Sequence, residues 1–452
     1  MNKKNLLIIC RDMPSNKGST ENIRLYNLIL LLRDHFVISV IAESASYGIS
    51  QLKNLCQFTS IDQEFLNFDA FFHTAQPECV IISRWMLASR FIDLIKQKNS
   101  KYKVRTIVDI PAVGFTQLEQ RLKFDDKSFT KDEIESYKQE EITAYNKADA
   151  CTVSCTTDKN MLTGIVNVPI YVAPHIYQLF DESRDLSIVN RNNVYFTGDF
   201  TYAANIDAIT WLYKDILPKM LFLNQNIKLH VIGSKIPNFV KSSKNVEVPG
   251  FVSNMYDYLK HMNICLAPIR IASGMIGKVC EAMAFGIPTV MTKLVAEQLS
   301  DFKVQHLENA IIVENDDMTT FTKSVLKLAN STSIITKMSK NVKQAVIDTI
   351  DLNKIRNTFL DALNIKGEKK IEVVKSFIDD VVDTNNIGNF DFDTEQVVEN
   401  EEEIFKSAEK VINEVEGKIK NENETKKVTI ETKDTGKLNN SDNPEPKECK
   451  GN

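Results

Sequence analysis

Two successive runs of alternating apolar and amphipathic segments organise the chain. In the first run, short apolar stretches predict buried strands at 6–10, 36–42, 79–83, 104–110, 150–154 and 170–174. The segments 23–35 and 88–98 carry apolar residues at helical spacing, and 123–149 predicts one long polar helix. Strands that alternate with helices favour an α/β fold with a doubly wound parallel sheet.

The second run repeats this pattern beyond residue 190. Apolar stretches predict strands at 193–198, 228–233, 246–250, 264–269, 287–292 and 310–315. Helical spacing recurs over 205–222, 253–263 and 276–285. Two separate runs predict two sheets, and we expect the boundary near 175–190, where the periodicity is lost.

Residues 366–452 have a different character. They hold 22 acidic and 14 basic side chains, a net charge of −8, whereas the whole chain carries −5, so the body before them is slightly basic. Apolar residues recur at helical spacing over 371–381 and 404–419, and the chain beyond about 423 is expected to be disordered. The two amphipathic segments dock a partner, pack on each other, or form a weakly helical, solvated tail; the sequence leaves all three open.

The composition is that of a folded protein with more than one domain. Apolar residues make up 43% of the 452 residues, which excludes wholesale disorder. At roughly 150 residues per domain, the length predicts two or three domains. Only 15 residues are glycine, which is about half the usual share of roughly 7%. Each glycine is therefore expected where the backbone needs it.

Cysteine usage and hydropathy predict a cytoplasmic protein. The eight cysteines form no CxxC pair, which argues against a zinc module, and most lie in apolar runs, as buried thiols do in a reducing compartment. The apolar run 6–10 is too short for a secretion signal, and no stretch of about 18 apolar residues predicts a membrane-spanning helix. Peripheral membrane contact is left open. The small positive excess of the body does not predict nucleic-acid binding.

Six glycines fall between residues 190 and 290, at the ends of predicted strands or in loops that lead into helices. They are Gly198, Gly233, Gly250, Gly274, Gly277 and Gly286. Ligands of open α/β sheets bind at the carboxyl ends of strands, so these glycines mark places where a ligand can approach the backbone. Ordinary turn chemistry is the alternative, above all for Gly233 and Gly250.

The segment 267–290, APIRIASGMIGKVCEAMAFGIPTV, combines these features most densely. A strand leads into a loop with Arg270 and Ser273, and the start of the following helix carries a partial positive charge that favours an anion. A diphosphate fits this place, because Arg270 and Lys278 add full charges nearby. Glu281 lies on the same helix face as Lys278 and suits the hydroxyl groups of a ribose. A surface ion pair between Lys278 and Glu281 is the alternative.

This segment resembles the donor-site signature of retaining GT-B glycosyltransferases of the family 4 type. Further stretches are similar to that family in the same order, namely CRDMPSNKGSTENIRLYNLILLL, NKADACTVSCTTDKNML, VYFTGDFTYAANIDAITWLYKDILPKM, LHVIGSKIP and NVEVPGFVSNMYDYLKHMNICLAPIR. The similarity spans about 1–350 and is strongest over 193–290. It implies a GT-B architecture, in which two doubly wound, Rossmann-like domains face each other across a cleft.

The resemblance implies a division of the chain into four parts. An acceptor-binding domain would occupy 1–180, and a domain that binds the nucleotide-sugar donor would occupy 190–350. A closing helix over 351–365 would follow, and the acidic, partly disordered tail would take up 366–452.

The resemblance also assigns roles to the residues of the dense segment. Lys278 and Arg270 would neutralise the donor diphosphate, and Glu281 would bind the nucleoside ribose. Ser273 and Gly274 would lie beside the phosphates or the transferred sugar. The family frequently has a glutamate where this chain has Ser273.

Three more positions complete the implied site. Gly18 would let the first acceptor-domain loop approach the donor, and Gly198 would lie by the donor at the end of the first donor-domain strand. Asp109 occupies the region near the reacting sugar, with a structural role as the alternative. The basic pair that is frequent after Gly198 is absent, and so is the histidine that is common near Asp109. These departures keep an unusual or inactive member of the family in consideration.

The implied activity is that of a retaining, hexosyltransferase-like enzyme of glycan biosynthesis. It would move a sugar from a nucleotide-diphosphate sugar to a hydroxyl group of a glycan, lipid or protein glycan, with no metal and no cofactor besides the donor substrate. A glycoside hydrolase would need a pair of catalytic carboxylates, and the sequence shows no evident pair. The alternatives are a non-catalytic GT-B scaffold whose acidic tail binds a protein partner, and a sugar-nucleotide epimerase on the same fold. A nucleotide sugar and a glycan or glycolipid acceptor are the expected partners.

Overall fold

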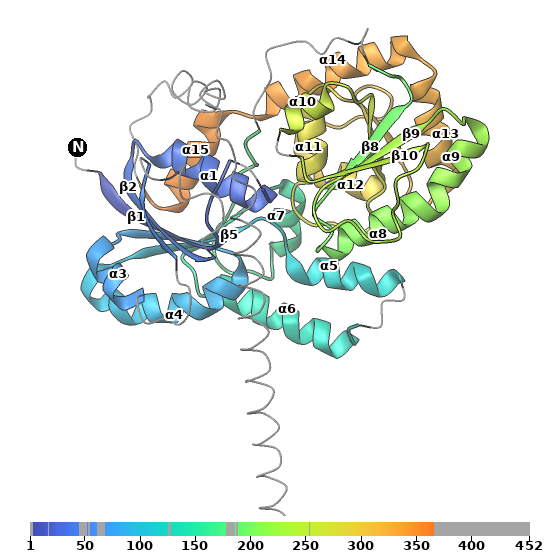
Figure 1. Cartoon of the computed structure of the whole chain (residues 1–452). Helices are drawn as coiled ribbons and strands as arrows, with labels where there is room; N and C mark the ends of the chain where they lie inside the picture. The colour runs from blue at the N-terminus through green and yellow to red at the C-terminus, as the bar shows by residue number, and fades with distance from the viewer. Residues whose placement is uncertain are drawn as a thin grey trace, which may run out of the picture. The chain divides into compact units, whose positions relative to one another are not determined.

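The computed structural model describes residues 3–365, with gaps at 17, 45–51, 53–54, 61–67, 125–127, 178–185, 187–188 and 253. The amphipathic segments and the disorder expected after residue 366 therefore lie outside the described residues. Two sheets are present, as predicted, and all their strand pairs are parallel. The α/β fold with two doubly wound sheets is confirmed (Figure 1).

Within the described residues, the first sheet has seven strands. In spatial order they are β3 (Gln57–Ser60), β2 (Phe36–Ser44), β1 (Lys4–Asp12), β4 (Cys79–Ser83), β5 (Arg105–Ile110), β6 (Ala150–Val153) and β7 (Ile170–Val172). The chain winds outwards from β1 to β3, then returns to place β4 on the other side of β1. The winding thus reverses between β1 and β4, which creates a topological switch point.

Helices cover both faces of the first sheet. They are α1 (Thr20–Leu32), α3 (Phe68–Ala75), α4 (Trp85–Tyr102), α5 (Gly114–Arg121), α6 (Lys131–Asn146), α7 (Thr156–Leu162) and α15 (Leu352–Ala362). One apolar cluster joins alternate residues of β1, such as Leu6 and Ile8, to α1 and α15. The cluster on the other face joins Leu7 and Ile9 to α3 and α4 (Figure 1). This alternation is what a strand buried on both faces requires.

The second sheet has six strands in the part of the chain that the structure describes. In spatial order they are β10 (Val246–Gly250), β9 (Lys228–Ile232), β8 (Asn193–Thr197), β11 (Ile264–Ala267), β12 (Thr289–Thr292) and β13 (Ala310–Val313). Its winding reverses between β8 and β11, so this sheet also has a switch point. The limits of the proposed domains stay predictions, but all strands of the first sheet precede residue 173 and all strands of the second follow residue 192.

The helices of the second sheet enclose a large apolar cluster. They are α8 (Ala203–Trp211), α9 (Leu217–Leu223), α10 (Met255–Leu259), α11 (Gly277–Ala284), α12 (Lys293–Gln298), α13 (Met318–Ala329) and α14 (Thr332–Thr349). A short π-helical segment, Leu212–Ile216, joins α8 to α9, so the helix expected over 205–222 is continuous but irregular. After α14 the chain returns to the first sheet, where Ile355 and Phe359 of α15 are buried.

Several elements of the first half differ from the sequence-based expectation. The long polar helix expected over 123–149 begins only at Lys131, because Thr130 caps it in a reciprocal capping box with Glu133. Strand β3 and helices α3, α5 and α7 were not predicted. β3 is a short edge strand, QFTS, without an apolar run, and α5 starts at Gly114 with no capping side chain from its own preceding residue.

Candidate functional site

Loops from both switch points supply the residues of the candidate site. In the first sheet, the loop after β1 carries Gly18, and Arg84 directly follows β4. In the second sheet, the loop after β8 begins with Gly198, and the loop after β11 leads into α11. Ligands of open α/β sheets bind at the carboxyl ends of strands at such reversals.

The first residues of α1 and α11 lie against each other. A Cβ atom added to Gly277 would be only 2.5 Å from the Oγ1 atom of Thr20. Because Thr20 opens α1 and Gly277 opens α11, the positively polarised starts of two helices come together. Free backbone N–H groups at helix starts attract anions, so the electrostatics of this junction favour a phosphate.

Lys278 lies in the first turn of α11 and is held by two neighbours. Its Nζ atom donates a hydrogen bond to Oδ1 of Asn205 in α8, and it lies 4.6 Å from the centre of the Phe196 ring. Burial lowers the pKa of Lys278 to about 8. The ammonium group is therefore poorly hydrated, and an anion that neutralised it would be bound strongly.

Glu281 lies one turn after Lys278, as the sequence predicts, but the two do not form an ion pair among the contacts of the described residues. Burial raises the pKa of the Glu281 carboxyl to about 7, because desolvation disfavours its ionised form. Hydroxyl groups that donated hydrogen bonds to the carboxylate would stabilise this ionised form. This environment agrees better with the ligand interpretation than with a surface ion pair.

A third group comes from the first sheet. Glu21, in the first turn of α1, accepts hydrogen bonds from the Ser83 hydroxyl at 2.6 Å and from Nε of Arg84 at 2.5 Å. The phenol of Tyr202, in the loop after β8, interacts with the Arg84 guanidinium. The carbonyl of Tyr202 in turn accepts from the backbone N–H of Asn205, the partner of Lys278.

These contacts close into a ring, which we call the junction ring. It runs through Thr20, Glu21, Arg84, Tyr202, Asn205, Lys278 and Gly277. Its members come from both switch points and include both helix starts. The sequence-predicted Lys278 belongs to it, and Glu281 follows one turn later. Thr20, Glu21, Arg84, Tyr202 and Asn205 were missed because only the strand order brings them together.

The loop after β11 is bound to the first half of the chain along most of its length. The side-chain amide of Gln120 forms two hydrogen bonds with the backbone of Ala272, at 2.6 and 3.0 Å. The Ser154 hydroxyl accepts from the backbone N–H of Met275 at 3.0 Å. The Met275 sulfur lies 3.2 Å from the backbone nitrogen of His175.

Ser273 is the centre of this contact. Its buried hydroxyl accepts from the backbone N–H of Val113 at 2.7 Å and donates to Oδ2 of Asp158 at 3.0 Å. Burial raises the pKa of Asp158, and its hydrogen bonds with Gly274 and Ser273 oppose that shift. Ser273 therefore lies between protein groups, and its predicted place beside the phosphates or sugar stays a prediction.

Gly274 makes the closest approach in this loop. Its φ is +73°, and an added Cβ atom would overlap the backbone carbonyl oxygen of Pro111. The sequence predicts that Gly274 permits close approach to a ligand; in the structure it permits close approach to the chain's own loop after β5. A side chain there would push the two loops apart.

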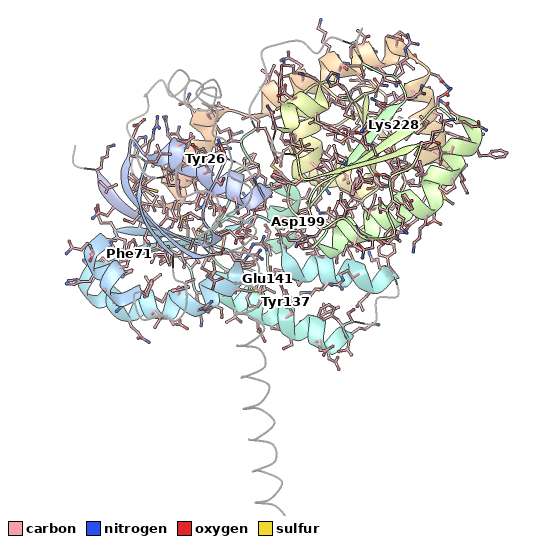
Figure 2. The ribbon with its side chains drawn as sticks, viewed as in Figure 1. Tyr26, Phe71, Tyr137, Glu141, Asp199 and Lys228 are labelled. Carbon is pink, nitrogen blue, oxygen red and sulfur yellow. The ribbon has the colours of Figure 1, made fainter. Side chains whose placement is uncertain are left out.

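Glu141 fixes the loop that receives Gly274 and Ser273. Its carboxylate accepts from the backbone N–H groups of Gly114 and Phe115, both at 2.8 Å, at the start of α5. Figure 2 shows Glu141 and Tyr137 along α6, beneath this start. Burial raises the pKa of Glu141. The carboxylate thus replaces the missing N-cap of α5 from a distant helix.

Arg270 is engaged by two carboxylates of its own half. Nε and Nη2 bind Asp207 at 3.0 and 2.6 Å, and Nη1 binds Asp316 at 3.0 Å. The guanidinium also lies over the rings of Phe124 and Trp211, at 4.4 and 4.8 Å from their centres. The two carboxylates already neutralise the guanidinium, so the predicted phosphate role of Arg270 lacks support from this geometry.

Asp109 has the surroundings of a structural residue. Both its oxygens bind Arg24, at 2.7 and 2.8 Å, and Oδ1 also accepts from the Thr152 hydroxyl at 2.6 Å. Arg24 donates further to the carbonyl of Ala173. The side chain of Asp109 has no exposed surface, so the geometry favours the structural alternative over contact with a reacting sugar.

The two remaining predicted glycines lie at the edges of the junction ring. Gly18, with φ +100°, precedes the Ser19 cap of α1. A Cβ atom on Gly198 would lie 2.8 Å from Nδ2 of Asn205, so Gly198 leaves room for the partner of Lys278. Asp199 follows it (Figure 2), and its carbonyl accepts from that same Nδ2 at 2.7 Å.

The described residues contain no group of three or more His, Cys, Asp and Glu side chains that could hold a metal ion. No helix in the described part of the chain is long and apolar enough to cross a membrane.

One protein-family model matches part of the second half of the chain. Residues 191–331 match the family model described as "Glycosyl transferases group 1". This segment contains β8 to β13 and α11, with Lys278 and Glu281. No sequence among the curated proteins matches the chain.

Several solved structures share the fold over 80% of the chain. Sucrose-phosphate synthase from Thermosynechococcus elongatus is 13% identical, with a TM-score of 0.61 and 98% of its own chain covered. HepE from Anabaena, solved with UDP-glucose, is 11% identical, with a TM-score of 0.59 and 99% covered. WaaG, a glycosyltransferase involved in lipopolysaccharide biosynthesis, is 12% identical, with a TM-score of 0.55 and 100% covered. At these identities the likeness establishes the fold alone.

Proposed function

The chain has the GT-B fold and resembles glycosyltransferases of group 1, and from this premise we propose that it transfers a sugar from a nucleotide-diphosphate sugar to an acceptor hydroxyl. The observation that carries the proposal is the junction ring, where two helix starts and Lys278 meet at the switch points of two sheets. A diphosphate has the charge and size that this place would bind.

The donor would lie across the carboxyl ends of β8 and β11. Glu281 would accept hydrogen bonds from the two ribose hydroxyls, and the start of α11 with Lys278 would hold the diphosphate. Desolvation favours both contacts, because the half-buried carboxylate and the half-buried ammonium would each gain a compensating partner. The Asn205 amide would keep Lys278 directed towards the helix start.

The chemical step needs charge stabilisation on the leaving group. As the glycosidic bond breaks, negative charge grows on the diphosphate, and the α11 start and Lys278 would stabilise it in place. We propose retention of configuration without a metal, with the acceptor attacking from the face that the diphosphate leaves. The departing phosphate would take the acceptor proton, so the site would need no strong general base.

We propose a glycan or glycolipid as the acceptor. WaaG is described as an enzyme of lipopolysaccharide biosynthesis, and TarM has been solved with UDP and α-GlcNAc-glycerol. HepE has been solved with UDP and glucose. These relatives make UDP-sugars the first donors to test. Binding of a protein by the acidic tail and contact with a membrane stay predictions.

A second candidate, a non-catalytic module, is favoured by one observation. Ser273 and Arg270, two residues to which the family pattern gives donor roles, are bound to protein groups instead. A protein that had lost its activity could use such residues to hold its halves together.

A donor screen separates these candidates. The full chain is incubated with UDP-, GDP- and ADP-sugars, and products are identified by mass spectrometry with and without glycan acceptors. Release of the nucleoside diphosphate or transfer of the sugar would support the proposed function. A changed nucleotide sugar formed without an acceptor would identify an epimerase. Absence of any turnover and of any nucleotide binding would refute the enzyme and favour the scaffold.

A further inference from the structure

Arg84 has a backbone conformation that a bulky residue adopts only under constraint. It directly follows β4, and its φ is +71°. Its backbone N–H donates to the carbonyl of Asp109, the neighbouring position on β5. Left-handed conformations of residues other than glycine cost about 1 kcal/mol or more and concentrate at functional sites. This conformation, together with the bond to Asp109, places the Arg84 side chain at the switch point of the first sheet.

The side chain of Arg84 is held by Glu21, but part of its guanidinium stays accessible to solvent. Nε and Nη2 bind Oε2 of Glu21, and Ser83 holds the other carboxylate oxygen. Burial alone would lower the pKa of Arg84, but Glu21 and Tyr202 raise it, so the guanidinium is permanently charged. The side chain of Arg84 is 28% exposed and that of Glu21 only 10%. The accessible part of this pair is thus its positive end.

Two comparable arginines in the described residues, Arg24 and Arg270, have different hydrogen-bond partners from those of Arg84. Arg24 directs all three nitrogens at Asp109 and Ala173 and is 3% exposed. Arg270 directs all three at Asp207 and Asp316. Arg84 directs two nitrogens at one carboxylate oxygen, and its further partner is the phenol of Tyr202, so a single carboxylate faces its guanidinium. A guanidinium with one carboxylate partner can bind a second anion.

The place of Arg84 in the junction ring indicates which anion this is. Glu21 adjoins Thr20, which touches Gly277 at the start of α11. On the other side, Tyr202 connects Arg84 through Asn205 to Lys278. Arg84 is therefore connected, from the first sheet, to the same helix start in which Lys278 lies.

We propose that Arg84 is a binding residue for the donor diphosphate, acting from the first half of the chain opposite Lys278. This inference rests on the proposed function, because it requires a nucleoside diphosphate at the start of α11. It also accounts for the loop after β8, where Asp199 and Phe200 stand in place of a basic pair. In this chain the second cation would come from β4, with Glu21 and Ser83 as its positioning residues.

The test compares nucleotides that differ in phosphate number. Calorimetry of the full chain measures the affinity for UDP, GDP and ADP, and for the matching monophosphate of whichever binds. A guanidinium–phosphate contact is charge-assisted, so Arg84→Ala should weaken diphosphate binding about ten- to a hundredfold. The preference for the diphosphate over the monophosphate should fall with it. Glu281→Gln should weaken both nucleotides alike, because the ribose is common to them.

Arg90→Ala is the matched control, since Arg90 lies on α4, the helix that follows Arg84, and likewise pairs with a carboxylate, that of Glu43. It should leave both affinities unchanged. If Arg84→Ala unfolds because Glu21 loses its partner, the double variant Glu21→Gln/Arg84→Gln removes both charges and should show the same loss of preference. Wild-type preference in a folded variant without the guanidinium would overturn the inference and leave the proposed function standing. A wild-type chain that binds no nucleoside diphosphate would overturn both.

Discussion

The hydroxyl of Ser273 donates a 3.0 Å hydrogen bond to the buried carboxylate of Asp158, and so joins the loop after β11 to the start of α7. The same hydroxyl accepts from the backbone N–H of Val113. One small side chain thus satisfies two buried groups of the first half of the chain. A glutamate, which the family pattern frequently has at this position, would add a second carboxylate beside Asp158.

Ser273→Ala should lower the free energy of unfolding by about 1–3 kcal/mol, because it leaves the N–H of Val113 and the carboxylate of Asp158 without this partner. Urea unfolding measures the change. Ser300→Ala is the control, because the Ser300 hydroxyl also lies near α7, 3.4 Å from Thr157, but is exposed. That variant should stay within about 0.5 kcal/mol of the wild type. Equal stability of both variants would show that the Ser273 contact has no energetic weight.

Gly274→Ala should destabilise the contact between the two loops far more than backbone strain alone explains. Gly250 provides the reference, since its φ of +77° is close to the +73° of Gly274, but an added Cβ atom would meet nothing within 4 Å. Gly250→Ala should therefore report the conformational cost alone, about 1 kcal/mol. Gly274→Ala adds the overlap with Pro111, and its melting temperature should fall below that of Gly250→Ala. Similar melting temperatures would mean that the two loops separate easily.

Asp109→Ala should cost about 3–5 kcal/mol of stability, because it leaves the guanidinium of Arg24 buried without its partner. Replacing both residues, in Arg24→Met/Asp109→Leu, should recover much of the loss. Chemical unfolding of the three proteins provides the comparison. A folded Asp109→Asn protein of wild-type stability that binds the donor but does not turn it over would contradict the structural role and restore the catalytic one.

The affinity for a nucleoside diphosphate should have an optimum between about pH 7 and 8. Below about 7, Glu281 is protonated and loses its preference for hydroxyl donors; above about 8, Lys278 loses its charge. Calorimetry from pH 5.5 to 9.5 would trace both limbs, and Glu281→Gln should lack the acidic one. A wild-type affinity that does not change over this range would contradict these environments.

The raised pKa of Glu281 also predicts that the stability of the protein depends on pH. The folded protein holds this proton up to about pH 7, whereas the ordinary carboxyl pKa is 4.5. Between these values the folded state binds more protons than the unfolded chain, so the contribution of Glu281 to stability falls as the pH rises. In Glu281→Gln this part of the slope should disappear from the melting curves.

The sheets could be predicted because buried parallel strands are nearly continuous apolar runs. LLIIC within β1 and ICLA of β11 have this form, whereas the edge strand β3, QFTS, does not. Helix α5 escaped prediction because the group that caps it is Glu141, which lies on α6, far along the chain. Sequence patterns thus predicted the elements that are stabilised by their own residues, and missed an element whose cap comes from another helix.

The residues of the candidate site also differ in whether local sequence could predict their roles. Lys278 and Glu281 could be predicted, since a three-residue spacing places them on one helix face whatever the fold. Arg270 looks identical to a phosphate-binding residue in sequence, because its partners Asp207 and Asp316 lie 63 and 46 residues away. Arg84 could have been noticed as the residue directly after an apolar run, but its importance depends on β1 and β4 being neighbours at a switch point.

The central claim is that the start of α11 and Lys278 hold the leaving diphosphate of a nucleotide sugar. The most direct test is the turnover of the best donor by Lys278→Ala, with Lys293→Ala as the control, because Lys293 opens α12 in an exposed pair with Glu314. The account predicts that Lys278→Ala loses about a hundredfold or more in turnover while its melting temperature changes little, and that Lys293→Ala behaves as the wild type. Wild-type turnover in Lys278→Ala would contradict it.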